Sequence, residues 1–119
     1  MLQTFSNEDL VGLTPVRARD LVVKCFLNAQ LETFKRAATK LGSNTSAEQL
    51  QRTVEGAVRL AFRSTKGDFE NPTKEALMAA VMDLAGKAAA MGTPHDIIDH
   101  HKQQLGRVFQ ALEQGERAA

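Results

Sequence analysis

The chain has 119 residues, which is enough for one globular domain with a single hydrophobic core. Alanine (17) and leucine (13) dominate, valine and isoleucine together supply 10 residues, and tyrosine and tryptophan are absent. This composition favours helices over an all-β sandwich or barrel. The net charge of +1 argues against a protein that binds polyanions through bulk charge. We therefore expect an all-α protein in which residues 1–119 form a single domain.

Targeting and membrane segments are not visible in the sequence. The first ten residues contain no basic segment followed by an apolar run, as a signal peptide would. The longest uncharged apolar stretch, residues 76–82, is far shorter than the roughly 20 residues that a membrane helix needs. Cys25 is the single cysteine and has no partner for an internal disulfide. We expect a cytoplasmic protein without membrane contact.

Capping residues mark the first two helices. Ser6, followed three residues later by Asp9, predicts the start of a short helix that Gly12 ends. Thr14 precedes a proline, which is favoured at the first position of a helix because it lacks an N–H group that would be unpaired there. We therefore predict a first long helix over residues 15–41, with a glycine as its stop.

Three further helices follow the same rules. Thr45 or Ser46 starts a helix that runs to Lys66, with Gly67 as its stop, and the next runs from Asn71 or Pro72 to Gly92. The last starts at Thr93 and Pro94 and frays near Gly115. The link over residues 67–71 contains Phe69, a large apolar residue that we expect to fold back over the end of the bundle.

Each long helix has a line of apolar residues at alternating spacings of three and four, the pattern of one buried face. Short links between four helices of similar length predict a four-helix up-and-down bundle, or a close relative, with a short extra helix at the N-terminus. The lines expected to face the core are Leu27, Leu31, Phe34, Ala38 and Leu41 in the first long helix; Leu50, Val54, Ala57 and Ala61, with Val58 and Phe62 beside them, in the second; Leu77, Val81, Leu84, Ala88 and Met91 in the third; and Ile97, His101, Leu105, Val108 and Leu112 in the fourth.

Two helices carry more apolar surface than one core requires. Either these second lines are core, covered by other helices, or they form a contact with a second copy or with another protein. Small residues let helices approach closely, and methionine adapts to varied shapes, so we predict an interface. The module would then be a homodimer, or bind another protein, in an interaction or regulatory role. The predicted interface residues are Ala18, Val22, Cys25 and Ala29 in the first long helix, and Met78, Met82 and Ala85, extended by Ala89, in the third.

One dense group of possible metal ligands lies at the start of the last helix, and it motivates an alternative function, a metal- or cofactor-binding helical protein. His95 and Asp99 are four residues apart, as are Asp96 and His100, and side chains at this spacing can converge on one metal. Carboxylates are also favoured in a first helical turn by the helix dipole without any metal. We expect a solvated first turn without a metal ion.

His101 lies within the apolar line of the last helix. A lone histidine there is more often a buried, hydrogen-bonded residue than a ligand, and this is what we expect. The alternative is an axial haem ligand, for which Met82 or Met91 could supply the second ligand. Cys25 lies on an apolar line without a nearby cation, so we interpret it as a packing thiol and not as a nucleophile.

A modest basic face on the first long helix, formed by Arg17, Lys24 and Lys35, raises the question of nucleic-acid binding. Such binders usually show a strongly basic balance with interleaved aromatic residues, which this sequence lacks, so we expect no nucleic-acid partner. Glycine-rich phosphate loops, serine-nucleophile elbows, paired CxxC motifs and EF-hand loops are also absent from the sequence. We expect no enzymatic activity and no cofactor.

Overall fold

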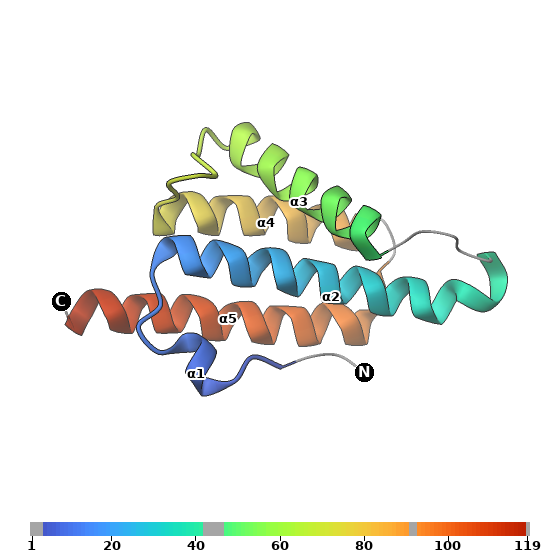
Figure 1. The fold of residues 1–119 in the computed structure, drawn as a ribbon, viewed down its shortest axis with the longest axis horizontal. Coiled ribbons are helices and arrows are strands. Elements are labelled where there is room, and N and C mark those ends of the chain that lie inside the picture. Colours follow the sequence, from blue (N-terminus) through green and yellow to red (C-terminus); the bar gives the residue numbers. More distant parts are fainter. Residues whose placement is uncertain (1–3, 42–46, 91–92, 119) are drawn as a thin grey trace.

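The computed structural model describes residues 4–41, 47–90 and 93–118, apart from the side chains of residues 34, 36–41, 47 and 116–118. Within these ranges all regular structure is helical, in the order α1 (Asn7–Leu10), α2 (Pro15–Leu41), α3 (Ala47–Ser64), α4 (Lys74–Ala90) and α5 (His95–Ala118). Successive long helices run in opposite directions, and α1 packs against α5 (Figure 1). The predicted four-helix bundle with a short N-terminal helix is therefore confirmed.

The predicted starts of α1 and α2 are confirmed by their caps. The Ser6 hydroxyl accepts a hydrogen bond from the Asp9 N–H, and the Asp9 carboxylate accepts one from the Ser6 N–H at 2.9 Å. Gly12 ends this segment with a left-handed φ of +64°. The Thr14 hydroxyl then accepts a hydrogen bond from the Arg17 N–H, and α2 spans the predicted residues.

The end of α3 differs from the prediction by about two residues. The helix ends at Ser64, and Lys66, not Gly67, adopts the left-handed conformation, with φ of +61°. The Gly67 N–H donates to the Phe62 carbonyl at 2.7 Å, which closes the turn as a Schellman motif. Gly67 is needed for a different reason, because a Cβ atom there would lie 2.9 Å from the Ala76 Cβ of α4.

The start of α4 and the end of α5 also shift. α4 begins at Lys74, two to three residues after the predicted start, because the Thr73 hydroxyl accepts the Ala76 N–H at 3.1 Å and so acts as the cap. α5 continues past Gly115 to Ala118. The following predicted caps, stops and core positions lie outside the described residues or side chains: Phe34, Ala38, Leu41, Gly42, Thr45, Ser46, Met91 and Gly92.

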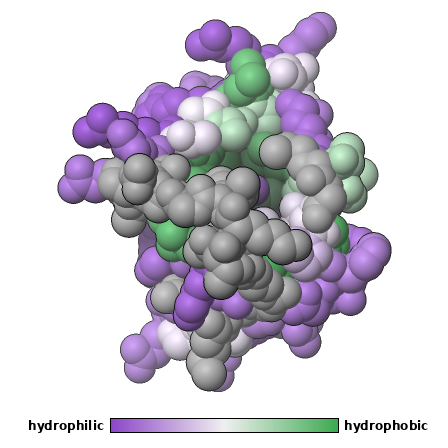
Figure 2. Space-filling model, turned by 90° about the vertical axis from the view of Figure 1, so that its right-hand side faces the viewer, coloured by the Kyte–Doolittle hydropathy of each residue, from purple (hydrophilic) through white to green (hydrophobic). Residues whose placement is uncertain are grey.

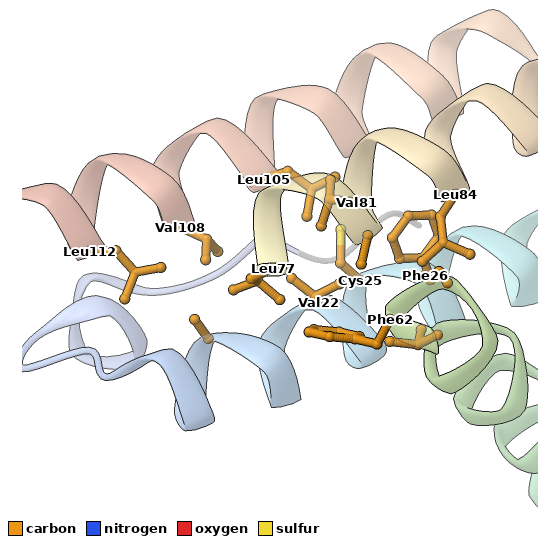
Figure 3. Packing of buried hydrophobic residues seen from close by; sticks show 14 of the residues in the cluster. Val22, Cys25, Phe26, Phe62, Leu77, Val81, Leu84, Leu105, Val108 and Leu112 are labelled. Atoms are coloured by element: carbon orange, nitrogen blue, oxygen red, sulfur yellow. The ribbon is translucent and has the colours of Figure 1, made fainter. Parts of the chain in front are cut away.

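The core lies where the four long helices meet (Figure 3). Val22 from α2, Phe62 from α3, Leu77 from α4 and Val108 from α5 are fully buried. The whole predicted line of α5 is buried, and so are the predicted residues of α3 except Ala57, which is exposed.

Within the described ranges, every helix is too short or too polar to cross a membrane.

The predicted core line of α2 is wrong at Leu31, which is 40% exposed although it was expected to face the core. Leu27, from the same line, is half-buried and packs against the core cluster. The line on the other side of the helix faces the core instead. The reason is the position of α2, which packs against α3, α4 and α5 at once, so the face nearest to α4 and α5 is the one that becomes buried (Figure 1).

Candidate functional site

The part of the predicted interface that lies on α2 is inside the molecule. Ala18 and Val22 have no exposed surface, and Cys25 and Ala29 are each 7% exposed. Ala18, Val22 and Cys25 belong to the core cluster, and Figure 3 shows Val22 and Cys25 there. These residues cannot contact a second molecule, so the interface prediction is wrong for α2 and the alternative, that this line is core, is correct.

The part of the predicted interface on α4 is at the surface. Met82 is 74% exposed, Met78 is 39% exposed, Ala85 is half-buried and Ala89 is exposed. We call these four residues the methionine face. They follow one another at spacings of four, three and four, so they share one side of α4, next to the side that buries Leu77. The sequence correctly identified this face as apolar surface that the core does not bury. Its role as an interface remains a prediction.

Other large apolar side chains are exposed on separate elements. Val11 at the end of α1 is 71% exposed, and Leu60 on α3 is 54% exposed. Scattered apolar residues of this kind are normal on protein surfaces. The two methionines differ because they stand one helical turn apart, so their side chains form a continuous surface.

The predicted metal ligands do not come together as a site. His95, Asp96 and Asp99 are exposed on the first turns of α5, and His100 is half-buried. Among the residues that the structure describes, no three histidine, cysteine, aspartate or glutamate side chains are arranged to hold a metal ion. The structure therefore adds no ligand from another helix to this group.

His101 is buried at the contact between α5 and α2. It is 9% exposed, and its ring packs edge-on against Phe26, with 4.2 Å between the ring centroids. Burial, with a smaller contribution from His100, lowers the pKa of His101 to about 4, so the imidazole is neutral at pH 7. Its buried Nε2 atom has no hydrogen-bond partner. Met82 points largely to solvent, so it does not face His101 as the haem alternative requires.

Cys25 lines a cavity of about 10 Å³ together with His101 and Asn28. Burial raises the pKa of the Cys25 thiol to about 12, so the thiol remains protonated at neutral pH. A protonated thiol is a poor nucleophile, and the neutral His101 carries no charge that would favour the thiolate. This arrangement agrees with the interpretation of Cys25 as a packing residue.

The link between α3 and α4 is held by a cluster that the sequence did not reveal. Phe69 packs edge-on against Phe62, and the guanidinium groups of Arg19 and Arg59 lie 4.7 and 4.1 Å from the centre of its ring. Arg19 also donates a hydrogen bond to the Phe69 carbonyl at 2.7 Å, and Arg59 pairs with the Glu70 carboxylate at 2.9 Å. The prediction that Phe69 folds back onto the bundle is confirmed.

A second polar cluster that the sequence did not reveal fixes the N-terminal segment on α5. The Phe5 N–H donates to Gln104 Oε1 at 2.9 Å, and Arg107 Nη1 donates to the Phe5 carbonyl at 2.7 Å. Gln104 is 3% exposed. The one feature of the sequence that indicates burial of Gln104 is its position three residues after His101, which places it on the buried side of α5. Both clusters stabilise the fold and leave the methionine face as the candidate functional site.

No family model, curated protein or solved structure matches this chain. The exposed side chains themselves therefore carry the evidence about function.

Proposed function

We propose that this chain is a small cytoplasmic helical-bundle module for protein interaction and regulation, and that it works as a homodimer. The observation that supports this function is the methionine face of α4, which presents Met78 and Met82 to solvent beside the small residues Ala85 and Ala89. Methionine side chains repack against varied surfaces, and alanines allow a second helix to approach closely.

The order of residues in the methionine face favours a second copy of the same chain as its partner. Two large residues are followed by two small ones, at the symmetric spacings of four, three and four. If two copies of α4 pack antiparallel, Met78 of one copy lies opposite Ala89 of the other, and Met82 lies opposite Ala85. Each large side chain then meets a small one, and the contact repeats across a two-fold axis, as in most homodimers.

Burial of these methionines provides a driving force of reasonable size. Complete burial of a fully exposed methionine side chain stabilises a contact by about 1.5–3 kcal/mol. A symmetric pair covers two copies of Met82, each 74% exposed, and two of Met78, each 39% exposed, so each side chain contributes a fraction of that gain. Part of this gain is lost as rotational and translational entropy on association. The balance is typical of a dimer that can dissociate, which suits a regulatory role.

The test compares two glutamate substitutions at exposed apolar positions. In Met82→Glu a charge lies in the proposed contact and must lose water on association, so we expect the dissociation constant to rise at least about 100-fold. Leu60→Glu, on α3 and 54% exposed, is the control and should not change it. Sedimentation velocity over a concentration series measures both, and circular dichroism checks that the helices remain.

Three results would contradict the proposal. The wild-type chain could be monomeric at high micromolar concentration, Met82→Glu could dimerise as strongly as wild type, or Leu60→Glu could be the variant that dissociates. In the last case the contact would lie on α3.

A further inference from the structure

An apolar pocket lies between α2, α3 and α4, on the part of the bundle where α3 begins and α4 ends. Its volume is about 280 Å³, and its apolar walls include Phe26, Leu50, Val54, Val58, Leu84 and Ala88. Figure 2 looks at this end of the molecule and shows apolar surface set between polar side chains. The sequence predicted most of these residues as core.

The size of the pocket indicates how large an occupant can be. A cavity of about 150 Å³ with comparable apolar lining stays dry and accepts benzene. The pocket in this chain has nearly twice that volume, so it can accept a hydrocarbon of roughly ten carbon atoms. This is near the lower limit for small-molecule sites, and such sites are common between the helices of bundles.

The polar residues of the lining indicate the chemistry of the occupant. Among the described residues that line the pocket, Gln30, Thr53 and Lys87 are polar and none is acidic. The Thr53 hydroxyl already donates to the Gln49 carbonyl at 2.9 Å within its own helix. Lys87 is half-exposed at the rim, where Asp83 holds its ammonium group at 3.1 Å. The body of a ligand must therefore be hydrocarbon, and a polar head at the rim meets a cation.

We propose that this pocket binds a single-chain carboxylate of about ten carbon atoms, with the alkyl chain inside and the carboxylate beside Lys87. The alkyl chain removes the apolar walls from water, which supplies most of the affinity. The carboxylate stays partly hydrated at the rim, where it shares the Lys87 ammonium group with Asp83, so this attraction adds only a small, salt-dependent part. The pocket and the methionine face lie on different sides of α4, so this proposal does not depend on dimer formation.

Isothermal titration calorimetry with decanoate on the full chain, below the concentration at which decanoate forms micelles, tests the proposal. We expect saturable binding of one decanoate per chain, and about 15-fold weaker binding of octanoate because two methylene groups are lost. Decanoate should bind about three- to fivefold more tightly than decan-1-ol. The Lys87→Gln variant should lose this preference while it still binds the alcohol.

Two phenylalanine substitutions show whether the ligand occupies this pocket. Ala57 lines the pocket and is itself exposed, so Ala57→Phe fills the space without displacing core residues and should weaken decanoate binding at least tenfold. Leu60→Phe, at an exposed position of the same helix outside the pocket, should leave binding unchanged. Thermal unfolding of both variants checks that they fold.

Several results would overturn the proposal. Decanoate could fail to bind at millimolar concentration, or Ala57→Phe could bind it as well as Leu60→Phe does, and either result rules out this pocket as the site. Equal affinity for decan-1-ol and decanoate, with no effect of Lys87→Gln, would rule out the carboxylate and assign a neutral occupant. Dimerisation measured on the same samples tests the proposed function separately.

Discussion

At the scale of single residues, His101 shows what a sequence pattern can and cannot predict. Its place in the apolar line of α5 predicted burial correctly, because that line depends only on helical spacing. Its contact with Phe26 and its unpartnered Nε2 atom could not be predicted, because both depend on how α5 and α2 are aligned in space. Gln104 and Arg107 illustrate the same limit, since the atoms they bind belong to Phe5, about 100 positions away in the chain.

The pKa of His101 makes the stability of the bundle depend on pH. The pKa is about 4 in the folded chain, lowered mainly by burial, and near 6.5 in the unfolded chain. The unfolded chain therefore takes up the proton first. Stability is complete above about pH 6.5 and falls between pH 6.5 and 4 by up to about 1.4 kcal/mol per pH unit, or about 3 kcal/mol in total.

The variant His101→Leu should remove this loss of stability, because leucine fills a similar volume and does not titrate. Urea unfolding of wild type and variant at pH 7 and pH 5 measures the difference. His95→Gln, at an exposed position of the same helix, is the control and should retain the wild-type pH dependence. An NMR titration in which folded His101 has a pKa of 6.5 or above would contradict burial of the neutral imidazole.

At the scale of helices, the existence of each element could be predicted and its exact ends could not. Ser6 and Thr14 cap their helices as predicted, because an N-cap is made by a side chain and backbone only three residues apart. The end of α3 was predicted about two residues too late, because Gly67 was expected to adopt the left-handed conformation that Lys66 adopts in the structure. Gly67 is required instead by the close approach of Ala76 on α4, which is a tertiary contact and leaves no local signal.

The end of α3 therefore predicts opposite effects for two neighbouring substitutions. Lys66→Gly should raise the free energy of unfolding by about 0.5–1 kcal/mol, because it relieves the left-handed conformation of a residue with a Cβ atom. Gly67→Ala should lower it by about 1–3 kcal/mol, because the new methyl group would lie 2.9 Å from Ala76 and 3.0 Å from Phe62.

Urea unfolding at pH 7 measures both changes, and the exposed substitution Gly56→Ala in the middle of α3 is a useful reference. A Cβ atom at Gly56 meets no neighbour, so this variant should be stabilised by about 1 kcal/mol through helix propensity alone. A destabilised Lys66→Gly variant, or a Gly67→Ala variant as stable as wild type, would show that this turn is built differently.

At the scale of the whole molecule, the sequence identified two apolar lines on α2 but could not decide which of them faces the core. Helical spacing defines the faces of a helix, and only the positions of its neighbours decide which face is buried. Because α2 contacts α3, α4 and α5, the line of Ala18 and Val22 became core. The methionine face could be identified because α4 carries more apolar surface than its neighbours cover, as the exposure of Met82 demonstrates.

The direction in which two copies of α4 pack can be tested with cysteines. In the proposed antiparallel dimer, position 82 of one copy lies opposite position 85 of the other, while two copies of position 82 are offset by about 4.5 Å along the helix axis. An equimolar mixture of the Met82→Cys and Ala85→Cys variants should therefore form an intermolecular disulfide faster under mild oxidation than either variant alone, because disulfides need closely placed Cα atoms. The buried Cys25, with its pKa raised to about 12, should not compete. Non-reducing electrophoresis over time measures the three rates. A parallel dimer would instead place position 82 opposite itself, so fastest cross-linking of Met82→Cys alone would exclude the antiparallel arrangement.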